Sequence, residues 1–235
     1  MHMNTPKSDV YNMDCLDAMR GMPDNAFDLA IVDPPYGIGI ANKNNGYYSR
    51  KGKRPANAHK KKEWDANIPS PEYFIELIRI SKNQIIWGGN YMTDYLYPSR
   101  CWIFWDKMKY VSNYADGEFA WTSFDENAKK VAIQHHGFMS SDPQKSIHPT
   151  QKPIALYKWL LSNYAKHGDR ILDTHLGSGS SRIAAYDMGF DFVGYELDAE
   201  YFDAMNKRFA AHISRPAMFT PDEMYQIEQK KLFET

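Results

Sequence analysis

Hydrophobic and polar positions divide the chain into short apolar runs and stretches with a helical period. Apolar runs of a few residues bounded by Gly, Pro or Asp predict buried strands, and apolar residues spaced three or four apart predict helices. Strands that alternate with helices indicate an α/β protein with a doubly wound, mainly parallel sheet. The predicted strands are Asp28–Val32, Gln84–Trp87, Cys101–Trp105, Arg170–Asp173 and Asp191–Glu196, and the predicted helices are Pro71–Asn83, Pro153–Tyr164, Ser180–Met188 and Asp198–His212.

The length of 235 residues predicts a single catalytic domain over 1–235. Residues 106–147 have no helical period and are predicted to form irregular strands and loops, and the polar tail 216–235 is predicted to extend off the domain. A hydrophobic content of 43% excludes a disordered chain, and no apolar stretch reaches the roughly 18 residues of a membrane span. Two cysteines form no disulfide framework, which favours a reducing cytoplasm, and we expect no metal site.

The net charge of −1 conceals a strong asymmetry. Eight of the 28 basic residues lie within 41–62, a segment without an acid, so the remainder holds 20 bases against 29 acids. A basic segment on an acidic body predicts a polyanionic partner, although a solvated loop is the simpler interpretation. We interpret 41–67 as a mobile DNA-binding loop. Its basic residues are Lys43, Arg50, Lys51, Lys53, Arg54, Lys60, Lys61 and Lys62.

A glycine turn joins the predicted strand ending at Asp173 to a helix, in the order Gly177-Ser178-Gly179. Glycines allow close approach of a ligand to the backbone, and an acid at the end of the next strand, Glu196, can accept the hydroxyls of a ribose. The pattern predicts an adenosine-containing cofactor. A dinucleotide fingerprint would have a third glycine where Arg182 stands, and Asp173 would repel a pyrophosphate but suit an ammonium group. S-adenosylmethionine therefore fits better than NAD.

A second loop, Asp33-Pro34-Pro35-Tyr36, follows the strand Asp28–Val32. Proline lacks a backbone N–H, so Asp33 and the Pro34 carbonyl can both accept from one amino group while Tyr36 stacks on a planar ring. The simpler interpretation is a stiff turn. Ligands of a doubly wound sheet bind at the carboxyl ends of strands, so we expect Asp33 and Gly177 to follow neighbouring strands.

These two loops, with His148-Pro149-Thr150-Gln151-Lys152-Pro153 between them, resemble the motifs of the DNA amino-methyltransferases, which methylate N6 of adenine or N4 of cytosine. The catalytic motif precedes the glycine loop, as in the permuted beta group. The resemblance covers about residues 10–212 and implies a circularly permuted, Rossmann-like, S-adenosylmethionine-dependent fold. Bacterial, archaeal or phage-infected cytoplasm and a restriction-modification setting would suit such an enzyme.

The resemblance also implies roles for individual residues. Asp14 would lie near the cofactor adenine, with Cys15 beside it, and the segment from His148 would hold the methionine end. Thr174 and His175 stand where Pro and Phe are typical, and we interpret His175 as a packing change rather than a ligand. The predicted cofactor-binding residues are Asp14, Cys15, His148, Thr150, Lys152, Asp173, Gly177, Ser178, Gly179 and Glu196, and the predicted catalytic residues are Asp33, Pro34, Pro35 and Tyr36.

The implied reaction is methyl transfer to the amine of a base flipped out of duplex DNA. Asp in the first motif position favours N6 of adenine; alternatives are N4 of cytosine and an RNA or protein-amide methyltransferase. An NAD-dependent oxidoreductase and a catalytically inactive DNA-binding protein are further alternatives. The oxidoreductase lacks its third glycine and does not explain Asp33–Tyr36, and the inactive protein stays open although both loops look intact.

Residues 106–147 are predicted to form a small target-recognition region. It is short, so the enzyme either reads a short site or pairs two protomers, and relatives in the beta group are often homodimers. Near the C-terminus, Gln229, Leu232 and Phe233 resemble the motif by which bacterial proteins bind the sliding clamp, and the simpler interpretation is a frayed helix end.

Overall fold

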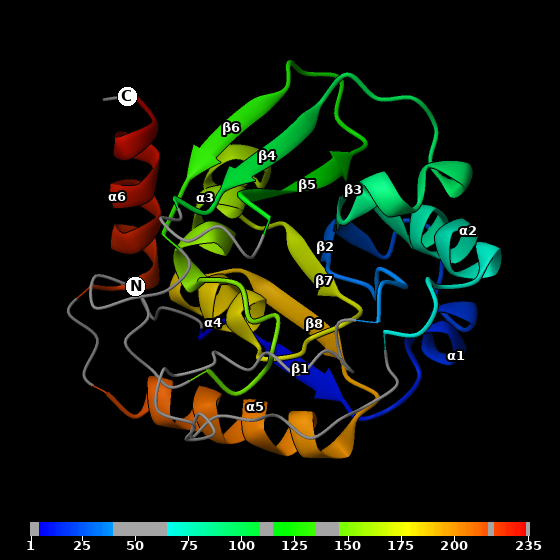
Figure 1. The fold of residues 1–235 in the computed structure, drawn as a ribbon. Coiled ribbons are helices and arrows are strands. Elements are labelled where there is room, and N and C mark those ends of the chain that lie inside the picture. Colours follow the sequence, from blue (N-terminus) through cyan, green and yellow to red (C-terminus); the bar gives the residue numbers. More distant parts are fainter. Residues whose placement is uncertain (1–4, 40–64, 109–114, 135–145, 216–218, 234–235) are drawn as a thin grey trace, which may run out of the picture.

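The computed structural model describes residues 5–39, 65–108, 115–134, 146–215 and 219–233, and Figure 1 shows their arrangement around one central sheet. Within these residues the sheet has eight strands in the order β1-β8-β7-β2-β3-β5-β4-β6. Its strands are β1 (Ser8–Tyr11), β2 (Phe27–Val32), β3 (Ser81–Trp87), β4 (Trp102–Asp106), β5 (Gly117–Thr122), β6 (Lys129–Ala132), β7 (Arg170–Asp173) and β8 (Asp191–Tyr195). The helices are α1 (Cys15–Arg20), α2 (Pro71–Ile80), α3 (Ile154–Tyr164), α4 (Ser180–Asp187), α5 (Ala199–Ile213) and α6 (Pro221–Phe233).

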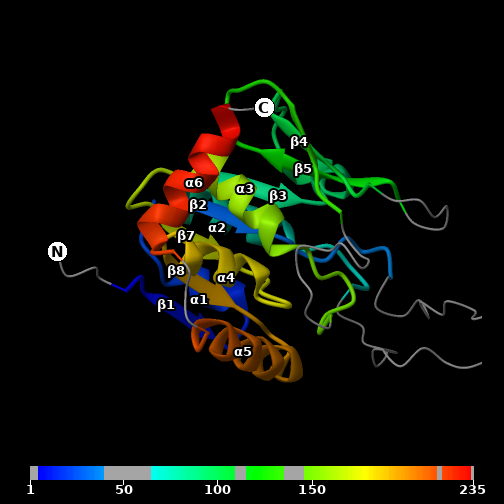
Figure 2. The same ribbon diagram turned by 90° about the vertical axis from the view of Figure 1, so that its left-hand side faces the viewer.

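Seven of these strands point the same way, and β5 alone is antiparallel to its neighbours β3 and β4. Alternate residues of β2 enter different cores: Leu29 and Ile31 pack with α3 and α4, whereas Ala30 and Val32 pack with α1 and α2. Figures 1 and 2 show the helices on both faces of the sheet. The prediction of a doubly wound, mainly parallel sheet is therefore confirmed.

The predicted strands and helices are present with small shifts at their ends. The prediction omitted β1 and α1, which span only 4 and 6 residues. Within the predicted recognition region, β5 and β6 extend the main sheet. The prediction that the tail 216–235 extends off the domain is wrong. Pro221–Phe233 forms α6, which packs on α3. Tyr225 joins the edge of the core there.

The arrangement of β2 and β7 determines where chemistry can occur. The two strands pair in parallel, with Leu29 opposite Ile171. Asp33 follows β2 and the glycine turn follows β7, so both loops leave the same edge of the sheet, as predicted. Among the helices described, none is both long and apolar enough to cross a membrane.

Candidate active site

Two adjoining cavities open at the carboxyl edge of β2 and β7. The larger, about 460 Å³, is bounded by the glycine turn, the segment after β8 and the start of α1. The smaller, about 340 Å³, is bounded by the loop Asp33-Pro34-Pro35-Tyr36, named the catalytic loop after its predicted role, and by the ends of β3, β4 and β5. Their shared wall consists of Asp33, Pro35, Thr150 and Lys152. A ligand in each cavity would therefore meet the other ligand at Asp33.

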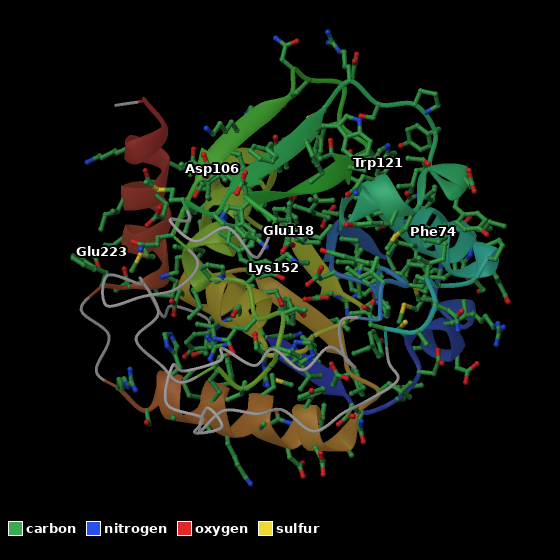
Figure 3. All side chains as sticks on the ribbon, viewed as in Figure 1. Phe74, Asp106, Glu118, Trp121, Lys152 and Glu223 are labelled. Atoms are coloured by element: carbon green, nitrogen blue, oxygen red, sulfur yellow. The ribbon has the colours of Figure 1, made fainter. Side chains whose placement is uncertain are left out.

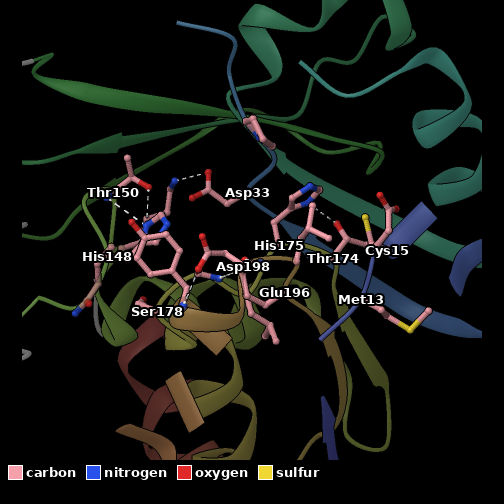
Figure 4. Close-up of a pocket in the computed structure, with 18 of the residues that line it drawn as sticks. Met13, Cys15, Asp33, His148, Thr150, Thr174, His175, Ser178, Glu196 and Asp198 are labelled. Carbon is pink, nitrogen blue, oxygen red and sulfur yellow. Dashed lines mark hydrogen bonds and ion pairs between the residues drawn. The ribbon is translucent and has the colours of Figure 1, made fainter. Parts of the chain in front are cut away.

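The glycine turn is held by the carboxylate of Glu196. Gly177 has φ of 48°, a conformation that favours glycine, and its N–H donates to Glu196 Oε2 at 2.8 Å. The other oxygen of Glu196 accepts the N–H of Asp198 at 2.9 Å. Figure 4 shows Glu196 and Asp198 beside the cavity. Glu196 thus lies at the predicted position, where it also holds the turn.

Asp173 has a different place from the one that its predicted ligand role requires. Its side chain is buried beneath the turn, where it accepts the N–H of His175 at 3.0 Å and the hydroxyl of Ser181 at 2.5 Å. Burial raises the pKa of Asp173 to about 7, and these two hydrogen bonds only partly oppose that effect. The carboxyl group supports the turn from behind and does not line the cavity.

The larger cavity brings together most of the predicted cofactor residues. Its lining includes Asp14, Cys15, His148, Thr150, Lys152, Gly177, Ser178 and Glu196, whereas Asp173 and Gly179 lie outside the lining. Asp14 caps α1 by accepting the N–H of Leu16 at 2.7 Å. Burial raises the pKa of Cys15 to about 12, so its thiol stays neutral.

The segment from His148 to Lys152 crosses the turn that follows β7. The ring of His148 packs beside Gly177 and edge-on to Tyr201, with 4.4 Å between the ring centroids. His148 Nδ1 and Thr150 Oγ1 are 3.1 Å apart. This segment therefore forms part of the wall of the larger cavity, and Figure 4 shows His148 and Thr150 there.

His175 both packs and lines the larger cavity. Its ring lies edge-on to Tyr73, and its Nδ1 is 2.9 Å from Thr174 Oγ1, which in turn is 2.7 Å from the Tyr73 hydroxyl. Burial lowers the pKa of His175 to about 4, so the imidazole is neutral near pH 7. The polar pair Thr174 and His175 thus replaces the usual Pro and Phe through contacts with α2.

The catalytic loop is held in place by the buried side chain of Asp65. Asp65 Oδ1 accepts the N–H of Tyr36 at 2.7 Å and that of Gly37 at 3.1 Å. The Tyr36 hydroxyl donates to Asp33 Oδ1 at 2.8 Å, and the Tyr36 ring stacks on Tyr91 with centroids 5.3 Å apart. The hydroxyl of Tyr36 therefore points at the carboxylate of Asp33.

A cluster of charged side chains surrounds Asp33. Lys152 Nζ lies 2.5 Å from Asp33 Oδ1 and 3.1 Å from Glu118 Oε2, and Lys107 pairs with the other oxygen of Glu118. Figure 3 shows Glu118 and Lys152 near the centre of the molecule. Burial acts to lower the pKa of Lys152, but the carboxylates outweigh it and the pKa is raised. Lys152 is thus protonated, and it lies in the wall that the two cavities share.

Sequence reasoning missed Lys107, Glu118 and Asp65, all of which line the smaller cavity. Lys107 follows β4 and Glu118 lies on β5, and neither belongs to a sequence motif. One signal was available: Glu118 is a charged residue inside a strand of otherwise small and aromatic residues, Gly117–Thr122. A buried charge requires a partner, which predicts a polar site nearby.

Several predicted residues fall outside the described part of the chain. All eight basic residues predicted to bind DNA lie in 40–64. In α6, the side chain of Gln229 donates to the Ser162 carbonyl at 2.6 Å, and the side chains of Leu232 and Phe233 are not described. The described residues contain no group of three His, Cys, Asp or Glu side chains that could hold a metal ion.

The helix-flanked, mainly parallel sheet places two adjoining cavities at its carboxyl edge, where ligands of such sheets bind. The family model for N6/N4 DNA methylases matches residues 81–207. The chain therefore belongs to the N6/N4 DNA methylase family. This confirms the family resemblance, while circular permutation remains a prediction.

Individual relatives agree with the family. The type II methyltransferase M2.MboI of Moraxella bovis is 22% identical over 236 residues, covering 85% of this chain and 86% of that protein. A solved complex of M1.HpyAVI with SAM has a TM-score of 0.55 at 19% identity and covers 85% of this chain and 98% of that one. The cytosine-N4-specific PvuII DNA methyltransferase has a TM-score of 0.57 at 12% identity, covering 98% of this chain and 95% of that chain. These likenesses confirm the predicted methyltransferase fold.

Proposed function

We propose that this protein transfers a methyl group from S-adenosylmethionine to the exocyclic amine of a base flipped out of duplex DNA, and that the base is adenine. The observation that carries the proposal is the shared wall of the two cavities, where Asp33 faces both. The methyl donor would occupy the larger cavity and the base the smaller one. Methyl transfer would then take place beside Asp33, through positioning and electrostatics.

The residues around the larger cavity suit S-adenosylmethionine. Glu196 at its edge is a carboxylate acceptor for ribose hydroxyls, and Asp14 lies beside the turn that opens α1. His148 and Thr150 form another part of the wall of this cavity. The cofactor supplies an electrophilic methyl group, and these residues orient it toward Asp33. Asp173 supports this site by holding the glycine turn rather than by touching the ligand.

The smaller cavity suits an amino-bearing base. Asp33 and the Pro34 carbonyl would accept the two amine hydrogens, which turns the nitrogen lone pair toward the methyl group. Tyr36 and the partly exposed ring of Tyr91 offer aromatic surface for the base. We assign adenine because the loop begins with Asp. Cytosine is the second candidate, since the similar PvuII enzyme is cytosine-N4-specific.

We also propose that the basic residues between 41 and 62 contact the DNA backbone. Gly39 and Asp65 flank this segment, and the N–H of Gly39 donates to the Asp65 carbonyl at 3.0 Å. The segment therefore leaves and rejoins the described structure beside Tyr36. Cationic residues entering from that point would meet phosphates next to a flipped base.

The test uses the purified chain with labelled S-adenosylmethionine and duplex DNA, with RNA and protein as alternative acceptors. Nucleosides from the digested DNA are separated to distinguish N6-methyladenine from N4-methylcytosine. We expect label in N6-methyladenine for the wild type and at least a 100-fold lower rate for Asp33→Ala. Asp94→Ala, an exposed site away from both cavities, is the matched control and should keep the wild-type rate.

Label in RNA or protein alone would refute the proposal, as would full activity of Asp33→Ala. Label in N4-methylcytosine would correct the base and leave the reaction class intact.

A further inference from the structure

Glu118 faces the catalytic loop across the smaller cavity and belongs to none of the motifs in the sequence. Its side chain projects from β5, the strand that runs against its neighbours. Glu118 Oε2 lies 3.2 Å from the Tyr36 hydroxyl oxygen and 3.1 Å from Lys152 Nζ. Its Oε1 pairs with Lys107. Glu118 is thus in contact with two cations and with the tyrosine of the catalytic loop.

Lys152 is fixed between the two carboxylates. Its ammonium group donates to Asp33 at 2.5 Å, to Glu118 at 3.1 Å and to the Tyr36 hydroxyl at 3.1 Å. An ammonium group has three hydrogens, so these three acceptors satisfy it completely. The side chain is 3% exposed and also lies over the ring of Trp87. Lys152 therefore cannot turn toward solvent without leaving both carboxylates.

The partners of the two carboxylates are unequal. Among the described residues, Glu118 pairs with two ammonium groups, from Lys107 and Lys152, whereas Asp33 pairs with Lys152 alone, which it shares. Two carboxylates and two ammonium groups give a cluster without net charge. If Asp33 became neutral, Lys152 would still be paired, because Glu118 would remain beside it. Without Glu118, the same event would leave a buried ammonium without a counter-ion, which is costly.

We infer, building on the proposed function, that Glu118 is a positioning residue whose carboxylate remains the counter-ion of Lys152 while Asp33 takes up and releases the proton of the methylated amine. The amine nitrogen forms a bond to the methyl carbon, and the carbon–sulfur bond breaks with its electron pair passing to sulfur. The nitrogen is then cationic, and it loses one proton to the Asp33 carboxylate. Asp33 passes this proton to water and returns to its starting state.

Charges facing the two carboxylates give this arrangement a pH signature. Burial raises the pKa of Asp33; Lys152 opposes this effect and the negative charge of Glu118 adds to it. Burial acts to raise the pKa of Glu118, but Lys152 and Lys107 lower it to about 2. Asp33 therefore titrates while Glu118 stays ionised. The other titratable groups that interact with Asp33 or Glu118 are Tyr36, Tyr73, Tyr157 and Asp173.

The test is the pH dependence of single-turnover methylation, with enzyme in excess over a duplex and saturating S-adenosylmethionine. In Glu118→Gln, Asp33 is the one remaining carboxylate partner of Lys152 among the described residues. The acid limb of the pH profile, where the rate falls as Asp33 is protonated, should therefore move down by about one pH unit. The plateau rate should fall roughly 3- to 10-fold, because Asp33 becomes a weaker base. Lys107→Met has the opposite effect: Glu118 draws more on Lys152, and the acid limb should move up.

Opposite shifts distinguish this role from a merely structural one, which would move neither limb. Glu118→Asp keeps the charge and should restore the wild-type limb. If circular dichroism shows that Glu118→Gln does not fold, Lys107→Met and Glu118→Asp decide the matter alone. Acid limbs that stay in place, or that move together, would overturn the inference while wild-type methylation continued. A wild type that methylates no DNA would instead overturn the proposed function.

Discussion

Gly88 lies directly against the ring of Tyr36. A β carbon on residue 88 would overlap the Cδ1 and Cε1 atoms of that ring, and Gly88 has φ of 68°. The two residues follow β3 and β2, which pair in parallel, so the end of one strand shapes the catalytic loop of the next. The tyrosine can occupy its position only because residue 88 has no side chain.

Gly88→Ala should therefore displace Tyr36 and slow methylation at least tenfold. The left-handed backbone alone costs about 1–2 kcal/mol, and the clash adds about 1–3 kcal/mol. Methylation rate and melting temperature check this expectation. Gly168→Ala is the matched control, because Gly168 has φ of 90° with open space around it. It should lose stability but keep its rate, and equal rate losses in both variants would contradict the role assigned to Gly88.

Asp65 should affect turnover and not cofactor binding. It accepts two N–H groups of the catalytic loop but does not line the larger cavity. Asp65→Ala leaves these donors without that acceptor, and we expect a roughly 10-fold lower kcat. Affinity for S-adenosylmethionine, measured by calorimetry, should stay within about twofold. Asp65→Asn keeps an acceptor oxygen and should recover most of the rate; a large loss of cofactor affinity in either variant would refute this assignment.

Glu196 should affect cofactor binding first. Both of its oxygens accept backbone N–H groups, from Gly177 and Asp198. In Glu196→Gln, one of these donors faces an amide NH₂, so the glycine turn should shift and the Kd for S-adenosylmethionine should rise about 10- to 100-fold. Glu200→Gln on the exposed side of α5 is the control. Similar Kd values for the two variants would show that Glu196 does not bind the cofactor.

Asp173 should give stability a distinctive pH dependence. Its pKa in the folded protein, about 7, is above the ordinary value of 3.8, so the folded state binds the proton more tightly than the unfolded state does. This group's contribution therefore declines as pH rises from about 4 to 7, by up to about 4 kcal/mol. Asp173→Asn cannot ionise, and its melting temperature should exceed that of the wild type at pH 8 but not at pH 4.

Asp187 provides the comparison of opposite sign. Burial acts to raise its pKa, but His212 and Lys158 outweigh burial and lower it. Its stabilising contribution is present near neutral pH and is lost on acidification, so Asp187→Asn should melt below the wild type at pH 8.

For Asp173, the contradicting outcome is a wild type and an Asp173→Asn variant whose melting temperatures respond equally to pH. That result would exclude the expected titration of Asp173.

The local sequence was sufficient to predict the two loops and the strands that carry them. The run from Asp28 to Val32 is apolar and ends at a diproline, and Arg170–Asp173 ends at a glycine turn. Both signals lie within a few residues. The placement of the two loops on neighbouring strands followed from a general rule for parallel sheets, since ligands bind where neighbouring strands end. These features are predictable because each depends on adjacent residues or on topology.

Features that depend on distant partners were not predictable. Glu118 is 85 positions from Asp33, and its place beside Lys152 arises only when β5 inserts antiparallel between β3 and β4. The prediction for the tail 216–235 was wrong because α6 has a weak apolar face. Its packing on α3 depends on contacts with distant residues, such as that of Gln229 with Ser162. The apparent ligand Asp173 turned inward because Ser181 and the N–H of His175 offer it donors behind the turn.

The backbone link between Gly39 and Asp65 has an evolutionary consequence. Gly39 and Asp65 are already hydrogen-bonded to each other. The stretch between them can therefore change in length or sequence without displacing Tyr36. The entropic cost of closing a loop grows only slowly with its length, so length changes there are inexpensive. If this stretch contacts DNA as proposed, related enzymes can vary that contact here while inheriting the same reaction chemistry.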